Sequence, residues 1–407
     1  KAHGLVSDRQ KPRFISHYDE WTTGMGLLYI KAECPEAATV FTTHATSIGR
    51  SICGNGKPLY DRLPYYNGDQ MARELNMESK HSLEKAAALQ ADCFTTVSEV
   101  TARECGQLLG RRPDIVTPNG FENNFVPSAS KFADARAAAR SKMLSVASSL
   151  TGHSFDDNTF IVVTSGRCEY RNKGIDLFLD SMTHMSYDNL DRPVLAFVMV
   201  PAWVDKARPD LTIALDDKAL KRLSDPVITH TLHNYNSDPV INRIHQIGFI
   251  NDADARVSVI YVPCYLNGAD GIFDMTYYDL LPGFDASVFP SYYEPWGYTP
   301  LESVAFGVPT VTTSLSGFGQ WILDTFTDSF AACGVRVEKR TDSNYDEVCE
   351  RISDDIASLV NNAQAELKKI SKAAKATAKS AAWSNFISYY ITAFDIALAN
   401  ADARNKK

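Results

Sequence analysis

Residues 290–319 read PSYYEPWGYTPLESVAFGVPTVTTSLSGFG and begin where a β-rich run, ASVFPS (286–291), ends. A loop then leads into a short predicted helix, PLESVAFG, which Thr299 and Pro300 open. In an open α/β sheet, ligands bind beyond the carboxyl ends of the strands, where helix N-termini also point. The free N–H groups and partial positive charge of a helix N-terminus suit a diphosphate. This strand–loop–helix unit therefore predicts a ligand site at the edge of a parallel sheet.

Similar β-rich runs alternate with helical stretches along almost the whole chain. Several runs are continuously apolar or β-branched, which is typical of parallel strands covered by helices on both faces. The pattern predicts an α/β protein with doubly wound domains. The other candidate strands are TVFTT (39–43), CFTTV (93–97), DIVTP (114–118), FIVVTS (160–165), VLAFVMV (194–200), RVSVIYV (256–262) and PTVTTS (309–314).

Helix ends and composition suggest how the chain is divided. Ser98 is a predicted cap for SEVTARECGQLL, which stops at Gly110. Residues 351–382 are rich in Ala, Lys and Ser and predict a long exposed helix. The final stretch predicts a helix docked on a core, with its aromatic residues at helical spacing. These aromatic residues are Trp383, Phe386, Tyr390 and Phe394.

A domain boundary is expected between Pro127 and Phe160, where bulky apolar residues are few. We predict a first domain at 1–135, joined by the terminal helix 383–407, and a second at 136–382. The first domain is left with about four strands, fewer than the roughly six of a doubly wound sheet. It is therefore expected to be incomplete.

Bulk composition excludes several classes of protein. The chain has 407 residues, a net charge of -8 and 44% hydrophobic residues, so we expect no attraction to nucleic acid. Its eight cysteines are scattered singly, which predicts reduced thiols and no zinc site. No apolar run approaches the ~18 residues of a membrane span. The first residues, KAHGLVSDRQ, lack the apolar core of a signal peptide. A cytoplasmic protein without a membrane partner is expected.

Two glutamates, Glu294 on the loop and Glu302 in the first helical turn, can reach the same crevice. Thr299 and Glu302 also fit a capping box, in which case Glu302 only satisfies backbone donors. Glu294 stands among three aromatic residues, a poor structural choice for a carboxylate, although exposed loop glutamates are common. The spacing therefore leaves both interpretations open.

The E-x7-E spacing within YYEPWGYTPLES, followed by TTSLSGFG, closely resembles the corresponding stretch of animal and fungal-type glycogen synthases. The spacing alone is shared by many retaining glycosyltransferases, but the surrounding residues make the match specific. Other segments resemble the family in the same order, so the chain resembles an N-terminally incomplete member. They are HYDEWTTG (17–24), FTTHATSIGR (41–50), KAAALQADCFTTVSEVTARE (85–104), PNG (118–120), SGRCEYRNKG (165–174), HNYNSDPVINRI (233–244) and YLNG (265–268).

The resemblance implies two Rossmann-like domains facing a cleft that holds the active site. It also implies transfer of glucose from UDP-glucose to the 4-hydroxyl of a nonreducing glycogen end, with retention of configuration. No metal or other cofactor is implied, which is consistent with a diphosphate charge neutralised by fixed cations and helix dipoles. A homo-oligomer, a tetramer by family resemblance, is expected, with residues 201–245 in the position of its contacts.

Four residues carry catalytic roles by resemblance. Arg167 and Lys173 follow the strand at 160–165 and would contact the diphosphate; otherwise each is a surface cation. His44 follows TVFTT and would meet the donor sugar, although a histidine at a strand end is often structural. Glu294 matches the essential family glutamate, which orients the glucose hydroxyls and stabilises an oxocarbenium-like transition state. A covalent and a front-face mechanism both stay open.

The remaining predicted site residues would bind the nucleotide sugar. By resemblance, Arg50 points into the cleft, Glu302 binds the ribose hydroxyls if it is not a cap, and Tyr298 and Thr299 present donors to phosphate. Tyr277 aligns with an aromatic residue that stacks on uracil, although a core tyrosine fits its segment equally well.

Three features depart from the family. A Gly-rich loop carrying a donor-holding lysine is absent from the sequence, which puts catalysis by this chain in question. The segment that matches a glucose 6-phosphate-sensing, arginine-dense helix carries lysines at 368, 372, 375 and 379 instead. Because lysine lacks the bidentate fork suited to phosphate, a solvated face and weak or no activation are predicted. Asp19, in HYDEW, replaces a second histidine.

Alternative functions remain. A related glucosyltransferase would use ADP-glucose or another acceptor. A non-catalytic glucan-binding relative is disfavoured because all four catalytic residues are present. A dehydrogenase is disfavoured because no G-x-G-x-x-G joins a strand to a helix.

Overall fold

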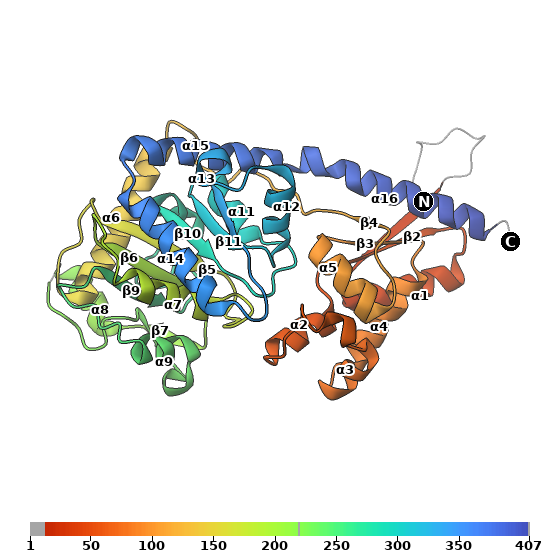
Figure 1. Ribbon diagram of the computed structural model, residues 1–407, viewed down its shortest axis with the longest axis horizontal. Coiled ribbons are helices and arrows are strands. Elements are labelled where there is room, and N and C mark those ends of the chain that lie inside the picture. The colour runs from red at the N-terminus through yellow and green to blue at the C-terminus, as the bar shows by residue number, and fades with distance from the viewer. Residues whose placement is uncertain (1–12, 219, 406–407) are drawn as a thin grey trace. The chain divides into compact units, whose positions relative to one another are not determined.

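The computed structural model describes residues 13–218 and 220–405, which divide into two compact units (Figure 1). Unit 1 comprises Lys1–Gly120 and Trp383–Lys407, and unit 2 comprises Phe121–Ala382. The segment KAHGLVSDRQ, considered above for a signal peptide, lies outside the described residues. Among the helices of the described ranges, none combines the length and apolar character needed to cross a membrane.

Unit 1 is built on a four-stranded sheet of order β1-β2-β3-β4, in which all neighbouring strands are parallel. The strands are β1 (Ile15–Asp19), β2 (Ala38–Thr43), β3 (Cys93–Thr96) and β4 (Ile115–Val116). The helical elements are α1 (Glu20–Glu33), α2 (Ser47–Gly54), η1 (Leu63–Tyr65), α3 (Gly68–Glu74), α4 (Glu78–Gln90), α5 (Glu99–Glu104), η2 (Cys105–Leu109) and α16 (Trp383–Arg404).

Helices cover both faces of this sheet, because alternate side chains of a strand point to opposite sides. Phe41 and Phe94 pack in one cluster with residues of α1 and α4. Val40 and Cys93 pack in another cluster with residues of α16. The terminal helix therefore docks on a core, as the sequence predicts. Its buried contacts to the strands come from alanines four residues apart, namely Ala393, Ala397 and Ala401.

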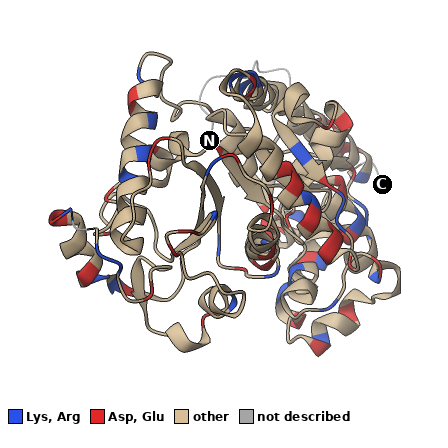
Figure 2. Ribbon diagram, turned by 60° about the vertical axis from the view of Figure 1, so that its left-hand side comes forward, with Lys and Arg blue, Asp and Glu red and all other residues tan. Residues whose placement is uncertain are grey.

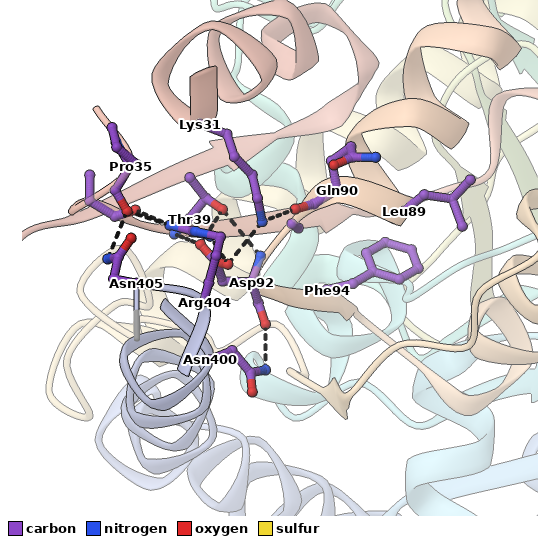
Figure 3. A network of polar contacts seen from close by, with 12 residues as sticks. Lys31, Pro35, Thr39, Leu89, Gln90, Asp92, Phe94, Asn400, Arg404 and Asn405 are labelled. Carbon is purple, nitrogen blue, oxygen red and sulfur yellow. Dashed lines mark hydrogen bonds and ion pairs between the residues drawn. The ribbon is translucent and has the colours of Figure 1, made fainter. Parts of the chain in front are cut away.

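A buried carboxylate ties α16 to the sheet (Figure 3). Asp92 accepts hydrogen bonds from the Thr39 amide and hydroxyl at 3.0 and 2.9 Å, and pairs with Lys31 at 2.8 Å. Its carboxylate also pairs with Arg404 of α16, and the Asn400 side chain donates to its carbonyl oxygen at 2.8 Å. Burial alone would raise the pKa of Asp92, but the bonds from Arg404, Lys31 and Thr39 outweigh burial and hold it below its ordinary value.

Unit 2 contains a six-stranded parallel sheet and a separate two-stranded antiparallel sheet. Its strands are β5 (Phe160–Ser165), β6 (Val194–Met199), β7 (Val204–Ala207), β8 (His230–Leu232), β9 (Val257–Val262), β10 (Ala286–Phe289), β11 (Thr310–Thr313) and β12 (Val335–Glu338). Its helical elements are α6 (Phe132–Thr151), α7 (Ile175–Met185), α8 (Pro209–Asp216), η3 (Tyr235–Ser237), α9 (Pro239–Gln246), α10 (Tyr277–Leu280), η4 (Leu281–Gly283), α11 (Tyr298–Ala305), α12 (Gly317–Thr325), α13 (Phe330–Cys333), α14 (Tyr345–Asn361) and α15 (Gln364–Ser380).

The large sheet has the order β12-β11-β10-β5-β6-β9. Numbered by their appearance in this sheet, the strands run 3-2-1-4-5-6 across it, which is the order of a Rossmann fold. Residues of α7, α9 and α14 pack on one face, and residues of α6, α8 and α10 pack on the other. The continuously apolar strands are thus parallel and buried on both faces, and the predicted α/β class is confirmed. Basic and acidic residues are interspersed along the helices (Figure 2).

Two local predictions differ from the structure. The boundary predicted at 135/136 falls inside α6, whose buried side chains belong to the core of unit 2, so the division lies earlier, after Gly120. The single exposed helix predicted for 351–382 is wrong, because the chain breaks between α14 and α15. Both helices bury one face, including Ile352 and Ile356 of α14 and Ala374 of α15. The predicted cap of α5 is confirmed, since Ser98 accepts from the Thr101 amide.

Asp92→Asn is expected to lower the free energy of unfolding by about 2–4 kcal/mol. This is below the ~3–5 kcal/mol of a fully buried pair because Lys31 and Arg404 keep some solvent contact. Since the folded pKa of Asp92 is depressed, its contribution is present above the unfolded pKa and lost as the pH falls through the folded pKa. Urea unfolding across this acidic range measures both effects.

The matched control is Asp402→Asn, which removes an exposed ion pair between Arg13 and α16. It should cost less than about 1 kcal/mol. Equal losses for the two variants would contradict the role assigned to Asp92.

Candidate active site

The candidate site of unit 2 lies beyond the carboxyl ends of β5 and β10. These strands pair in parallel, so the loops that follow them, 166–174 and 290–297, leave from the same edge of the sheet. The strand order reverses between them, because β6 and β9 extend the sheet on one side and β11 and β12 on the other. Ligands of open α/β sheets bind at such a switch point.

The two loops are joined through their backbones. The carbonyl oxygen of Asn172 accepts hydrogen bonds from the amides of Tyr292 and Tyr293, at 2.9 and 3.0 Å. Gly174 has φ +67°, and a Cβ there would lie 2.0 Å from the carbonyl oxygen of Pro290. Arg340, which is buried, donates to that same oxygen. The two loops therefore hold a fixed separation.

An ion pair bridges the joined loops. The Lys173 ammonium contacts the Glu294 carboxylate, and the two side chains are only 16% and 12% exposed. The carbonyl oxygen of Glu294 accepts the Gly317 amide at 3.0 Å, so its loop is also anchored to the start of α12. A cation and a carboxylate thus stand together at the switch point, suited to a phosphate and to a group that develops positive charge.

The start of α11 excludes the capping-box interpretation of Glu302. The cap position is Gly297, with φ +116°, and no side chain caps the helix. The Glu302 carboxylate instead accepts a hydrogen bond from the Tyr278 hydroxyl at 2.8 Å. Burial raises the pKa of Glu302, and the Tyr278 bond offsets only part of that effect. This carboxylate is therefore not consumed by backbone donors.

The other predicted residues of unit 2 occupy the same edge. Tyr298 and Thr299 form the first turn of α11, and Tyr298 is 45% exposed. Arg167 follows β5 and is largely exposed, with Glu169 at 3.8 Å. Tyr277 packs against the core, and its hydroxyl lies 2.8 Å from the Ser165 hydroxyl at the end of β5.

In unit 1, His44 follows β2 at the carboxyl edge of the other sheet. Its amide donates to Glu20 at 3.0 Å, and its Nε2 lies 3.1 Å from Asp19 Oδ1. Arg50 belongs to α2, and its charge acts on Glu20.

Buried acids hold the loop that carries His44. Glu84 accepts from the Thr43 hydroxyl and from the Ser47 amide and hydroxyl, the last two at 2.9 and 2.6 Å. Glu104 accepts from the Thr46 hydroxyl at 2.7 Å. Burial raises the pKa of Glu84 to about 7 despite its hydrogen bonds. The loop is therefore held by hydrogen bonds to these two buried carboxylates.

Comparison with known proteins shows the family. The glycogen synthase family model matches residues 3–210 and 212–405. The chain belongs to the glycogen synthase family. It is 31% identical to glycogen [starch] synthase isoform 1 of Saccharomyces cerevisiae, over 85% of this chain and 58% of that protein. It is 31% identical to the liver enzyme of Homo sapiens, over 86% of this chain and 57% of that protein. The chain thus spans little more than half the length of these glycogen synthases.

Solved structures show the same fold as this family member. Sucrose-phosphate synthase from Thermosynechococcus elongatus superposes with a TM-score of 0.51 and 15% identity, covering 96% of this chain and 73% of that chain. The catalytic domain of starch synthase IV from Arabidopsis thaliana superposes with a TM-score of 0.51 and 13% identity, covering 95% and 73%. The predicted two-domain glycosyltransferase fold is confirmed.

Most of the site residues that were predicted by resemblance to glycogen synthases lie at one edge of the unit 2 sheet. Lys173 and Glu294 are in direct contact, and Glu302 lies in the middle of the neighbouring helix α11. His44 and Arg50 belong to unit 1. The roles of all these residues stay predictions.

Sequence reasoning did not identify several residues that shape the site. Tyr278 holds Glu302, and Asn172 and Arg340 hold the loops. Asn172 lies beside Lys173 in the segment SGRCEYRNKG, which resembles the family. It acts through its backbone carbonyl, however, and such a role does not depend on the identity of the side chain. Glu20 was part of HYDEW, yet its contact with His44 required β1, which was not predicted.

One group of side chains has the composition of a metal site but is already satisfied. His230, Cys264 and Asp270 bring ligand atoms within 4.8 Å of one another. The His230 ring nitrogens contact the Thr229 hydroxyl and the Asp270 carbonyl oxygen, at 2.8 and 3.0 Å. The Asp270 carboxylate accepts three backbone amides, and burial raises the pKa of Cys264 to about 12. These bonds favour a structural role.

Gly174→Ala should destabilise unit 2 more than its backbone angle alone explains, because its Cβ would overlap the Pro290 carbonyl. Gly248→Ala is the control, since Gly248 has φ +82° with nothing within 4 Å of a Cβ. We expect about 1–2 kcal/mol for the control and a clearly larger loss for Gly174→Ala. Urea unfolding compares them, and equal losses would contradict a tight contact between the loops.

Proposed function

We propose that this protein transfers glucose from UDP-glucose to the nonreducing 4-hydroxyl of glycogen, with retention of configuration and without a metal. Family membership supports the reaction class. The observation that carries the proposal is the Lys173–Glu294 pair at the switch point of a Rossmann sheet, beside the start of α11. There a nucleotide's phosphates would meet a cation and a helix N-terminus, with a carboxylate beside the sugar.

Each group of unit 2 then has a defined task. Lys173, Arg167 and the first turn of α11 would neutralise charge that builds on the departing diphosphate. Glu294 would orient the glucose and stabilise positive charge at its anomeric carbon. Glu302 would accept hydrogen bonds from ribose hydroxyls, and Tyr277 would lie toward the base. In unit 1, His44 would meet the donor sugar, and Arg50 would contribute positive charge.

The localisation and the oligomeric state are proposed from the resemblance to the family. We propose a cytoplasmic homo-oligomer, a tetramer by resemblance, which light scattering of the purified protein would test. ADP-glucose is the alternative donor, because the starch synthase IV structure is described as bound to ADP and acarbose. Competition between the two labelled donors separates these alternatives.

Glu294→Gln is expected to lower the rate of labelled glucose transfer from UDP-glucose to glycogen by about 10²–10³, assayed in chelator. Glu347→Gln, which removes an exposed ion pair of unit 2 with Arg351, should leave the rate nearly unchanged. If Glu294→Gln retained more than about a tenth of the rate, the proposed role would be wrong.

The double variant Lys173→Met/Glu294→Gln separates catalysis from stability. If the pair were only structural, removing both charges together would relieve the unpaired charge left by a single change and restore activity. We expect the double variant to fold and to stay inactive, because both groups act on the donor. Recovered activity would contradict this role.

Glucose 6-phosphate should activate the enzyme by no more than about twofold, since α15 presents lysines and not bidentate arginines. Lys368, Lys372 and Lys379 are exposed, as predicted for a solvated face. Lys375 differs, because its ammonium lies 3.8 Å from the centroid of the Phe132 ring and desolvation lowers its pKa. Initial rates with and without the ligand measure the effect, and clear multi-fold activation would contradict the prediction.

A further inference from the structure

Asp19, singled out above as a departure from the family, contacts the side chain of His44. Asp19 ends β1 and His44 directly follows β2, and the parallel register places Asp19 opposite Thr42. Asp19 Oδ1 lies 3.1 Å from His44 Nε2. The hydrogen bond from His44 is the largest effect on the pKa of Asp19, which lies below its ordinary value. Asp19 is therefore a carboxylate acceptor at this distance.

The adjacent residue grips the backbone of the same histidine. Glu20 has φ +64°, a left-handed conformation that is strained for a residue with a side chain. Its carboxylate accepts the His44 amide at 3.0 Å. Strain of this kind persists only where surrounding contacts enforce it. Asp19 and Glu20, which are consecutive in the sequence, thus hold the imidazole and the backbone amide of His44, respectively.

A carboxylate accepts hydrogen bonds and donates none, so the Nε2 atom that faces Asp19 must carry the proton. In the neutral ring, Nδ1 is then a lone-pair acceptor. Among the described residues, Nδ1 of His44 has no hydrogen-bond partner. The contact between Nε2 and Asp19 therefore determines that Nδ1 is the nitrogen that faces a ligand as an acceptor.

We propose that Asp19, supported by Glu20, is a positioning residue that fixes the Nε2–H tautomer of His44, so that Nδ1 accepts a hydrogen bond from a hydroxyl of the donor sugar. This inference rests on the proposed function for its ligand, but the tautomer is a property of the protein alone. Because Nδ1 is then an acceptor, Asp19 would favour a sugar group that donates a hydrogen bond, such as a hydroxyl, over a group that can only accept one.

The neighbouring charges are consistent with this pairing. His17 lies 4.0 Å from Asp19, but its Nε2 contacts the Thr42 hydroxyl at 2.7 Å, and burial lowers its pKa. The Arg50 charge acts on Glu20. His44 is therefore the hydrogen-bond donor to Asp19.

The test compares Asp19→Asn with the native protein, because an amide can either accept from Nε2–H or donate to a bare Nε2. Long-range ¹H–¹⁵N spectra of histidine-labelled protein, on the alkaline side of the ring titration, report the tautomer, and His44→Gln assigns the signal. The control is Asp69→Asn, which alters a comparable contact in unit 1, from Asp69 to His81 at 3.0 Å.

We expect His44 to be Nε2-protonated in the native protein and a mixture of tautomers in Asp19→Asn. The kcat/KM for UDP-glucose should fall about 10–100-fold, the range found when metal-binding histidines lose the partners that orient them. Asp69→Asn should change the His81 signal and leave the rate nearly unchanged.

A His44 signal that is indifferent to Asp19→Asn would overturn the proposal. A shifted tautomer with unchanged kcat/KM would overturn the role in sugar recognition. Should no donor support transfer, the proposed function fails, while the spectra still decide whether Asp19 sets the tautomer.

Discussion

The parallel pairing of β5 with β10 is the constraint on which the candidate site depends. These strands are far apart in sequence, yet they end at the same edge, so the loops carrying Lys173 and Glu294 become neighbours. Backbone contacts then set the spacing, through the Asn172 carbonyl and the close approach of Gly174 to Pro290. Without that strand pairing, the charges would have no fixed relation, since neither side chain is held by its own loop alone.

In unit 1, the loop that bears His44 is also held in place, but by acidic side chains and not by the backbone of a second loop. Its sheet has fewer strands, and the loop bearing His44 is held by acids from outside the loop, namely Glu20, Glu84 and Glu104. Glu84 and Glu104 are buried, and buried acids are costly unless they are hydrogen-bonded. All three acids accept from hydroxyls or amides of the loop. The polar side chains of Thr43, Thr46 and Ser47 are thus explained by the acids that they satisfy.

The sequence predicted the parts of the structure that depend on local pattern. Continuous apolar runs identified the central strands, and the E-x7-E stretch placed Glu294 at a strand end. β1 and β12 were not predicted because they carry polar or charged residues, such as Asp19 and Glu338, which interrupt an apolar run. The Glu302 cap was mistaken because Gly297 begins the helix two residues before Thr299, and Tyr278, from a distant segment, captures the carboxylate. Contacts of this kind depend on tertiary structure, which local pattern does not encode.

The docking of α16 has a consequence for how the chain folds as it is synthesised. One face of the first sheet is covered by Ala393, Ala397 and Ala401, which are translated after all of unit 2. A nascent chain therefore carries this apolar face uncovered while the second Rossmann sheet is completed, since domains fold as they emerge from the ribosome. The unit that is translated first is the one that is finished last, and its sheet needs protection from aggregation throughout that interval.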